Sequence, residues 1–286
     1  MVDPVNLITS WLIISALYAL VAIGFTMIFG VGGVLNLAHG AVVAVGAFAA
    51  YAVTARGFGP WTGALAALAA GGLFSAGLYL LMIRNVDDEP ILVMILTLVS
   101  SIIVEEFLRT FVGTQPRAVP GLASGQVPVA GTTVQANMVL MFVVSWLLIG
   151  ALLLFIDHTD TGKAIIATSM SAKGAAVVGI DSDRIHLYTW LIAGVLAGIA
   201  GVFLASYLTA SWAMGRQPLI LSFSIVILGG LGSIRGSVVG AYLIGFLEVF
   251  TVNVVNPRLS GVASLVVLVL VLLVRPEGLF GRELAE

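Results

Sequence analysis

The stretch GVGGVLNLAHGAV, residues 30–42, decides how this sequence folds. It interrupts an apolar run from Val5 to Val53 with four glycines, an asparagine and a histidine. Gly30, Gly32 and Gly33 would loosen a helix there, and each backbone polar group left facing lipid would cost several kcal/mol. The sequence therefore predicts a helix break whose backbone faces protein or water.

The composition places this break inside a membrane protein. Of 286 residues, 60% are hydrophobic and only 9% are charged, whereas soluble domains carry about 25% charged residues. Apolar runs of about 20 residues, the length that crosses a bilayer as a helix, occur many times. We predict an all-α integral membrane protein with about 8–9 transmembrane segments, built as a single transmembrane domain over residues 1–286.

Chain breaks and charges divide the apolar sequence into candidate spans. They are expected at 5–29, 36–55, 61–83, 90–112, 138–156, 187–209, 218–230 (short), 236–252 and 262–275. The N-terminal MVDPVN lacks the basic region of a secretory signal, so 5–29 is taken as the first span. Two longer polar stretches remain, an expected external loop at 113–137 and an expected cytoplasmic loop at 157–186.

Basic residues indicate the orientation, because they are retained on the cytoplasmic side. One alternate set of loops, placed inside, holds seven of them: Arg84, Lys163, Lys173, Arg184, Arg235, Arg275 and Arg282. The outer set holds five: Arg56, Arg109, Arg117, Arg216 and Arg258. We expect the N-terminus outside and the C-terminus inside.

Several kinds of chemistry are not expected of this chain. It has no cysteine and only three histidines, none spaced i, i+3 or i, i+4 with another, so no metal site is predicted. No run of Lys or Arg suggests nucleic-acid binding. No Walker or dinucleotide motif occurs, so we expect no ATP hydrolysis and no cofactor in this chain. An intramembrane Ser/His protease is a distant alternative, because no serine lies in a recognisable elbow.

Asn36 and His39 supply the polar side chains of the first break. Asn36 could cap the helix that resumes toward Ala55, and His39 follows three positions later on nearly the same face. One interpretation is an N-cap plus a buried, hydrogen-bonded imidazole. The other is a break that lines a cavity at membrane depth.

A second glycine-rich break lies in LGGLGSIRGSVVGAYLIGFLEVF, residues 228–250. Its glycines are Gly229, Gly230, Gly232 and Gly236, and they surround Ser233 and Arg235.

Small residues also recur at helical spacing, as expected for faces where helices pack closely in lipid. These stripes are Ala193, Ala197 and Gly201; Gly194 and Gly198; and Ser237, Ala241 and Gly245.

Three glutamates fall within predicted spans, where an ionised carboxylate is costly. Glu105, Glu106 and Glu248 all fall in the outer half of their spans. Glu105 precedes Arg109 by four positions, the favourable order for a helical ion pair, so we predict that pair at the interface. The alternative is a role in an outer gate, or in holding the ammonium group of a zwitterionic substrate.

Four segments together resemble the permease subunits of branched-chain amino acid ABC importers. They are GVLNLAHG with GAFAAY, TDTGKAIIATSMSAKGAAVVGIDSDRI, VLGGLGSIRGSVVGAYLIGFLEV and the terminal LLVRPEGLFG. They occur in the family's order between residues 24 and 281. The middle of the second segment, IIATSMSAKGAA, is poorer in charge than the family's pattern.

The resemblance implies specific roles for the matching residues. Asn36, His39 and Gly40 match one glycine-rich turn of the family, Gly229, Gly230, Gly232 and Gly236 match the other, and Glu248 matches a family position. The loop from Gly162 to Arg184 would dock on an ATPase through residues that include Gly162, Lys163, Lys173, Gly179, Ile180 and Asp183. A short helix over Gly162–Val178, stopped at Gly179, would act as a rigid lever.

The resemblance implies a permease in the cytoplasmic (inner) cell membrane that works by alternating access. Its implied partners are a second permease, two ATP-binding cassette ATPases that use the ATP, an extracytoplasmic solute-binding protein and membrane lipid. Leucine-like amino acids, other amino acids, amides and urea all fall within the solutes it permits. The alternative is an ion-coupled secondary transporter, which would normally need acidic residues near the midplane.

Overall fold

The computed structural model describes residues 4–129, 131–275 and 278–280. Within these ranges six helices are long and apolar enough to cross a membrane. They are α1 (Pro4–Gly32), α3 (Pro60–Leu78) continued by the π-helix η1 (Tyr79–Ile83), α4 (Pro90–Phe111), α5 (Ala136–His158), α8 (Ser182–Tyr207), and α10 (Ile234–Phe250) continued by the π-helix η2 (Thr251–Val255). Three shorter apolar helices are α2 (His39–Thr54), α9 (Arg216–Gly229) and α11 (Val262–Val274). The chain is therefore a predominantly helical membrane protein, as predicted.

Each predicted apolar segment forms a helix. The largest boundary difference is at α8, which begins at Ser182 instead of 187. Its N-cap is Asp181, whose Oδ1 accepts a hydrogen bond from the Arg184 N–H at 3.3 Å. This cap starts the helix in the polar sequence, before the apolar residues that defined the predicted span.

The expected external loop contains a β-hairpin that the sequence did not reveal. Strands β1 (Gln126–Val129) and β2 (Thr132–Gln135) pair antiparallel, with Gln126 opposite Gln135. A 3-10 helix, η3 (Pro257–Leu259), follows η2. Strands of four residues are too short to give a clear period-2 pattern, which explains why only a loop was predicted.

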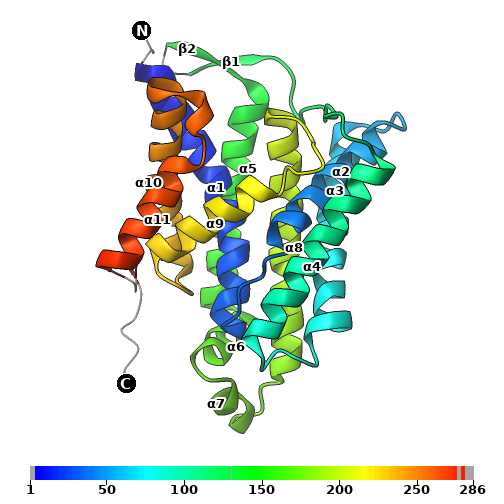
Figure 1. Ribbon diagram of the computed structural model, residues 1–286, viewed down its shortest axis with the longest axis vertical. Coiled ribbons are helices and arrows are strands. Elements are labelled where there is room, and N and C mark those ends of the chain that lie inside the picture. Colours follow the sequence, from blue (N-terminus) through cyan, green and yellow to red (C-terminus); the bar gives the residue numbers. More distant parts are fainter. Residues whose placement is uncertain (1–3, 130, 276–277, 281–286) are drawn as a thin grey trace.

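Helices α1 and α8 form the centre of the molecule. In the most apolar 18-residue stretch of each helix, 78% of the residues of α1 and 72% of those of α8 are buried, against 28% in both α4 and α5. Figure 1 shows α1 running along most of the height of the molecule, with α4 along one side. An apolar helix with few buried residues has its remaining surface available to lipid or to another chain.

The predicted stripes of small residues are packing faces. A β-carbon on Gly198 would overlap the Ala67 carbonyl of α3, and one on Gly201 would overlap the Val43 carbonyl of α2. On the third stripe, Gly245 of α10 leaves room for Ser15 of α1. Without a hydrophobic force between helices in lipid, such backbone contacts are a main source of association.

The polar segments gather at two opposite ends. The hairpin end carries β1, β2 and the start of α1, and the other end carries α6 (Asp160–Met170) and α7 (Ala172–Val177) (Figure 1). At the hairpin end the backbones of Arg117 and Ala210 exchange hydrogen bonds of 2.7 and 2.8 Å. At the α6–α7 end Arg84 pairs with Asp183 at 2.9 Å. Loops that the sequence assigned to one side are therefore in contact with each other.

Candidate functional site

The first break lies where the sequence predicts it. Helix α1 ends at Gly32, residues 33–38 are not helical, and α2 begins at His39. Gly33 has a φ of +64°, a conformation in which side chains are strained. Its N–H still donates to the Phe29 carbonyl at 2.7 Å, so the chain leaves α1 immediately after a last helical bond.

Asn36 does not cap α2, so that prediction is wrong. Its Oδ1 accepts from the Ala38 N–H at 3.0 Å, which forms an Asx turn just before the helix. The N-cap residue is Ala38, which has no capping side chain. Asn36 is 1% exposed, and its Nδ2 has no hydrogen-bond partner among the described residues.

His39 is buried and joins α2 to the middle of α1. Its Nε2 donates to the Val21 carbonyl at 2.9 Å, and its ring meets Phe25 edge-on at 5.7 Å. A β-carbon on Gly24 would lie 3.0 Å from the His39 Cε1 atom, so this small residue leaves room for the imidazole. Nδ1 has no partner within the described part of the chain, so the imidazole is only half satisfied.

The second break is a tight turn between α9 and α10. Gly230 and Gly232 have φ values of +102° and +80°. Ser233 then caps α10, because its Oγ accepts from the Gly236 N–H at 3.0 Å. Gly229 and Gly236 are in backbone contact, and a β-carbon on either would overlap the carbonyl of the other.

The last turn of α1, just before the first break, meets the second break, a contact that the sequence did not reveal. A β-carbon on Gly30 would lie 3.5 Å from the Cα of Gly232. Beside them the hydroxyls of Thr26 and Ser237 are hydrogen bonded at 2.6 Å, which joins α1 to the first turn of α10. These contacts hold the end of α1 against the second break and the start of α10.

Glu105 does not pair with Arg109, so the predicted i, i+4 pair is wrong. Its carboxylate binds Arg216, at the start of α9, with a shortest separation of 2.7 Å. Arg109 pairs instead with Glu106 at 2.6 Å. The Glu105 side chain is 18% exposed against 57% for Glu106, because it points toward α9. Arg216 also lies over the Trp212 ring, 5.1 Å from its centroid.

Glu248 is 3% exposed and is held by the turn before α11. Its oxygens accept from the Gly261 N–H at 2.9 and 3.0 Å, and from the Ser260 hydroxyl. The Gln217 amide lies 3.4 Å away. This carboxylate has the contacts of a structural anchor for the turn.

The predicted helix over Gly162–Val178 is wrong, because two helices, α6 and α7, occupy this segment. Ser171 ends α6 and caps α7 by accepting from the Gly174 N–H at 3.0 Å. The predicted stop at Gly179 is confirmed, with a φ of +85°. Thr159 caps α6 through the Gly162 N–H at 3.0 Å, and a β-carbon on Gly162 would overlap Phe155 at the corner with α5.

The surface around α6 and α7 carries exposed apolar side chains that the sequence analysis did not single out. They are Ile166, Met170, Val177 and Val178, from 40% to 87% exposed. Among the predicted contact residues, Lys163 and Lys173 are exposed, Ile180 is half-buried, and Asp183 binds Arg84. The four-residue spacing of Ile166 and Met170 was the signal available in the sequence.

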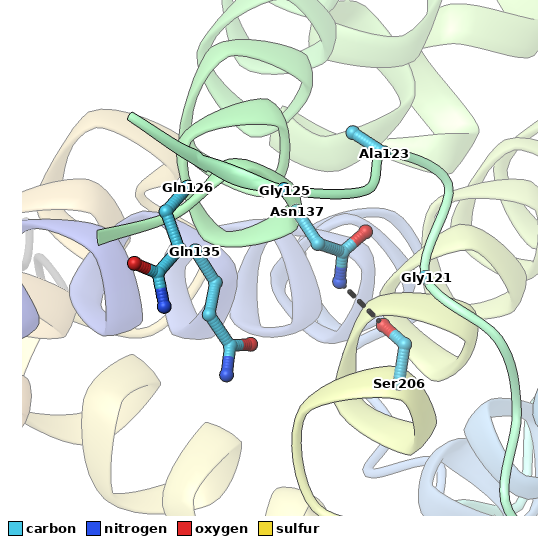
Figure 2. Close-up of a pocket in the computed structure, with 7 residues that line it drawn as sticks. All are labelled: Gly121, Ala123, Gly125, Gln126, Gln135, Asn137 and Ser206. Carbon is cyan, nitrogen blue, oxygen red and sulfur yellow. Dashed lines mark hydrogen bonds between the residues drawn. The ribbon is translucent and has the colours of Figure 1, made fainter. Parts of the chain in front are cut away.

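A pocket of about 360 Å³ opens at the hairpin end. Figure 2 shows Asn137 donating to the Ser206 hydroxyl, at 2.9 Å, with Gln126 and Gln135 beside it. The Asn137 Oδ1 accepts from the Leu122 N–H at 2.8 Å, so this buried amide fixes the pocket wall. The lining carries no charged side chain: Gly121, Ala123, Gly125, Gln126, Gln135, Asn137 and Ser206.

Comparison with known proteins identifies the family. Residues 7–272 match the family described as branched-chain amino acid transport system / permease component. The high-affinity branched-chain amino acid transport system permease protein LivH of Escherichia coli K12 is 32% identical, over 94% of this chain and 92% of its own. BraD of Pseudomonas aeruginosa, a permease protein of the same description, is 31% identical over 96% and 95%.

A more distant relative carries a different description. The fructose import permease protein FruF of Bifidobacterium longum is 26% identical, over 92% of this chain and 76% of its own. No solved structure matches this chain significantly. The match along nearly the whole sequence, together with the two glycine-rich helix breaks, shows that the chain belongs to the permease components of branched-chain amino acid transport systems.

Proposed function

We propose that this chain is the membrane permease of an ATP-binding cassette importer that translocates branched-chain or related amino acids into the cell. The observation that carries the proposal is the full-length match to permease components, in a chain where the end of α1, just before the first break, contacts the second break. The chain itself catalyses no reaction. Two cytoplasmic ATPases bind and hydrolyse the ATP, because this sequence has no nucleotide-binding motif.

The proposed mechanism is alternating access in the cytoplasmic (inner) membrane. The long and the short apolar helices would together give nine spans, with the N-terminus outside and the α6–α7 end in the cytoplasm. The count of seven basic residues against five supports this orientation, although Arg282 lies outside the described residues. A second permease would complete the pathway beside this chain.

The two breaks are the proposed hinges. Backbone that is free of a regular helix can absorb a reorientation at a few φ and ψ angles. The free polar atoms of the first break, Asn36 Nδ2 and His39 Nδ1, are buried and able to bind a polar group. We assign Asn36, His39 and Gly40 to the substrate pathway on this basis, and the glycines of the second break to the same pathway.

Glu105 and Arg216 form the proposed outer gate. Their ion pair links α4 to the first residue of α9, so a movement of either helix changes it. A carboxylate in this position could also exchange its guanidinium partner for the ammonium group of an amino acid. Glu248 is assigned to this region as an anchor, because its oxygens are already bound to the Ser260–Gly261 turn.

The α6–α7 segment is the proposed contact with an ATPase. Its exposed apolar side chains, with Lys163 and Lys173 nearby, are the composition of a docking surface rather than of a solvated loop. Gly162 and Gly179 would hold the two ends of the segment in place. Ile180 and Asp183 would pass its movement to α8, and Asp183 is already joined to Arg84.

The pocket at the hairpin end is the proposed contact for an extracytoplasmic solute-binding protein. Its uncharged lining offers amide and hydroxyl groups, which suit the polar uncharged side chains of a protein surface. A free amino acid would instead need charged partners for its ammonium and carboxylate groups.

The ion-coupled alternative is less well supported. Glu105 and Glu248 both have partners within the described chain, whereas a coupling site needs an acidic group free to bind an ion. The relatives over the full length are named as transport-system permease components, and FruF shows that a related permease is named for a different solute. The solute must therefore be measured.

The test is uptake by proteoliposomes that contain this chain, a second permease and the two ATPases, with the solute-binding protein outside. We expect uptake of labelled leucine that requires internal ATP and persists when ionophores dissipate the ion gradients. Uptake that stops with the gradients, while ATP is present, would favour the ion-coupled transporter. Isoleucine, fructose and urea in the same assay would define the solute class.

A further inference from the structure

One side chain of α4 completes the first break from outside it. Thr97 is fully buried, and its Oγ1 accepts the Leu37 N–H at 3.1 Å. The same hydroxyl donates to the Val93 carbonyl, one turn back in α4, at 2.9 Å. The hydroxyl is therefore used twice, once by its own helix and once by the unwound segment.

The backbone of the break makes this bond unusual. Of the N–H groups of residues 33–38, only three have a hydrogen-bond partner in the described chain. Gly33 binds the end of α1, and Ala38 binds the side chain of Asn36 within the break. Among the described residues, the Leu37 N–H is the one in this segment that binds another helix. Leu37 is half-buried, and a backbone N–H that is shielded from water without a partner is costly. Thr97 is the described residue that satisfies this N–H.

Apolar packing joins the same two elements. Val93 of α4 is fully buried and belongs to a cluster that contains Val34 and Ala38 of the break and Tyr79 of η1. Val93 and Thr97 are four residues apart and thus lie on one face of α4. The break is held from this side by an apolar contact and a hydrogen bond together.

The same helix reaches the start of α9. Glu105 lies eight residues beyond Thr97, close to the same face, and binds Arg216. Helix α4 otherwise lies at the periphery, because most residues in its most apolar stretch are not buried. Besides a weak bond from the Ser100 hydroxyl to the Met82 sulfur of η1, the polar side-chain bonds that α4 makes to other described elements go to the first break and to the start of α9.

We propose that Thr97 is a positioning residue that fixes the unwound segment 33–38 to α4, so that α4 and the break move together. The proposal goes beyond the importer function by naming the element that controls the first hinge. The expected effect on transport rests on the importer function. The expected effect on the hydrogen bond between Thr97 and Leu37 does not.

The test uses the assembled transporter with Thr97→Val, which keeps the shape and removes the hydroxyl, and Thr97→Ser, which restores it. Thr189→Val is the matched control, because Thr189 is buried and, among the described residues, its hydroxyl bonds only the Ile185 carbonyl of its own helix. Hydrogen exchange, resolved to single amides by fragmentation of a peptide that covers residues 33–38, reports the Leu37 amide. We expect exchange of that amide to accelerate about fivefold in Thr97→Val, the equivalent of one lost hydrogen bond, and to return in Thr97→Ser.

Transport gives the second readout. Thr97→Val should lower the maximal uptake rate by about threefold or more, with the substrate KM within about twofold, since a hinge is altered and not a binding group. Thr97→Ser and Thr189→Val should stay near wild type. If Thr97→Val gives little folded protein, Thr97→Ala, which cannot overpack the site, takes its place.

Unchanged exchange at Leu37 in Thr97→Val, or equal effects of Thr97→Val and Thr189→Val, would overturn the proposal. Failure of Thr97→Ser to restore both readouts would do so as well. If the wild-type assembly shows no ATP-driven uptake but the exchange result holds, the importer function is wrong and the positioning role stands.

Discussion

Gly40 and Gly215 lie so close that a β-carbon on either would overlap the carbonyl oxygen of the other. Gly40 is in the first turn of α2, and Gly215 immediately precedes α9. Two helices whose starts are far apart in the sequence therefore begin at one backbone contact. A change in the direction of α2 must be accommodated by the start of α9, because packed backbones have no side chain that can give way.

Replacing Gly40 with alanine should damage the fold. The added methyl group must displace the backbone at Gly215, and overpacking of this kind costs about 1–3 kcal/mol. Thermal unfolding of the purified protein measures the effect. Gly150→Ala is the control, because no described atom outside its own helix backbone lies within 4 Å of a β-carbon at that position. Equal stability of the two variants would contradict the backbone contact.

Removing the charge of Glu105 should impair transport more than stability. The pair with Arg216 is partly exposed, so Glu105→Gln is expected to change the stability by about 1 kcal/mol or less. As a gate residue, however, its loss should lower the uptake rate by about threefold or more. Glu106→Gln removes the neighbouring, more exposed pair and should transport normally. A wild-type rate in Glu105→Gln would exclude the gate.

Much of this architecture could be predicted from the sequence, because its signals are local. Apolar length gave the helices, and the glycines at 30–33 and 229–236 gave both breaks. The stop at Gly179 follows from the same kind of signal, and so does the burial of His39, which interrupts an apolar run. Each depends on residues within a few positions of one another.

The errors share a different cause. The true partner of Glu105 is 111 residues away, so the local i, i+4 rule selected Arg109 instead. The Asn36 side chain accepts a hydrogen bond from the Ala38 N–H, two residues further along the chain. Because this local bond competes with capping, α2 begins only at His39. Likewise, Ser171 offers a capping hydroxyl that divides the expected helix. The contact between the end of α1 and the second break could not be predicted, because no local property of either segment indicates its distant partner.

The end of the α6–α7 segment should be sensitive to backbone conformation at Gly179 and not to side-chain size. Its φ is +85°, and apart from its chain neighbours no atom of the described residues lies within 4 Å of a β-carbon there. Gly179→Ala should therefore cost about 1–2 kcal/mol locally and reduce the transport obtained per ATP hydrolysed. Gly179→Asn, which tolerates this conformation better, should be less affected. The opposite order of the two variants would contradict the backbone explanation.

The proposed orientation can be tested with single cysteines, since the chain has none of its own. Ser124→Cys lies in the loop before the hairpin, and Lys173→Cys is exposed on α7. In intact cells an impermeant thiol reagent should label Ser124→Cys and spare Lys173→Cys until the membrane is opened. Labelling of Lys173→Cys from outside would reverse the orientation and remove the contact with the ATPases.

The central claim is that the break between α1 and α2 responds to ATP bound on partner subunits. Leu35→Cys, in the partly exposed middle of that break, tests it most directly. In the assembled transporter its rate of thiol labelling should change by about threefold or more when the ATPases are trapped with ATP, while Phe58→Cys, in the exposed turn after α2, stays constant. A labelling rate at residue 35 that is the same with and without bound ATP would contradict the account.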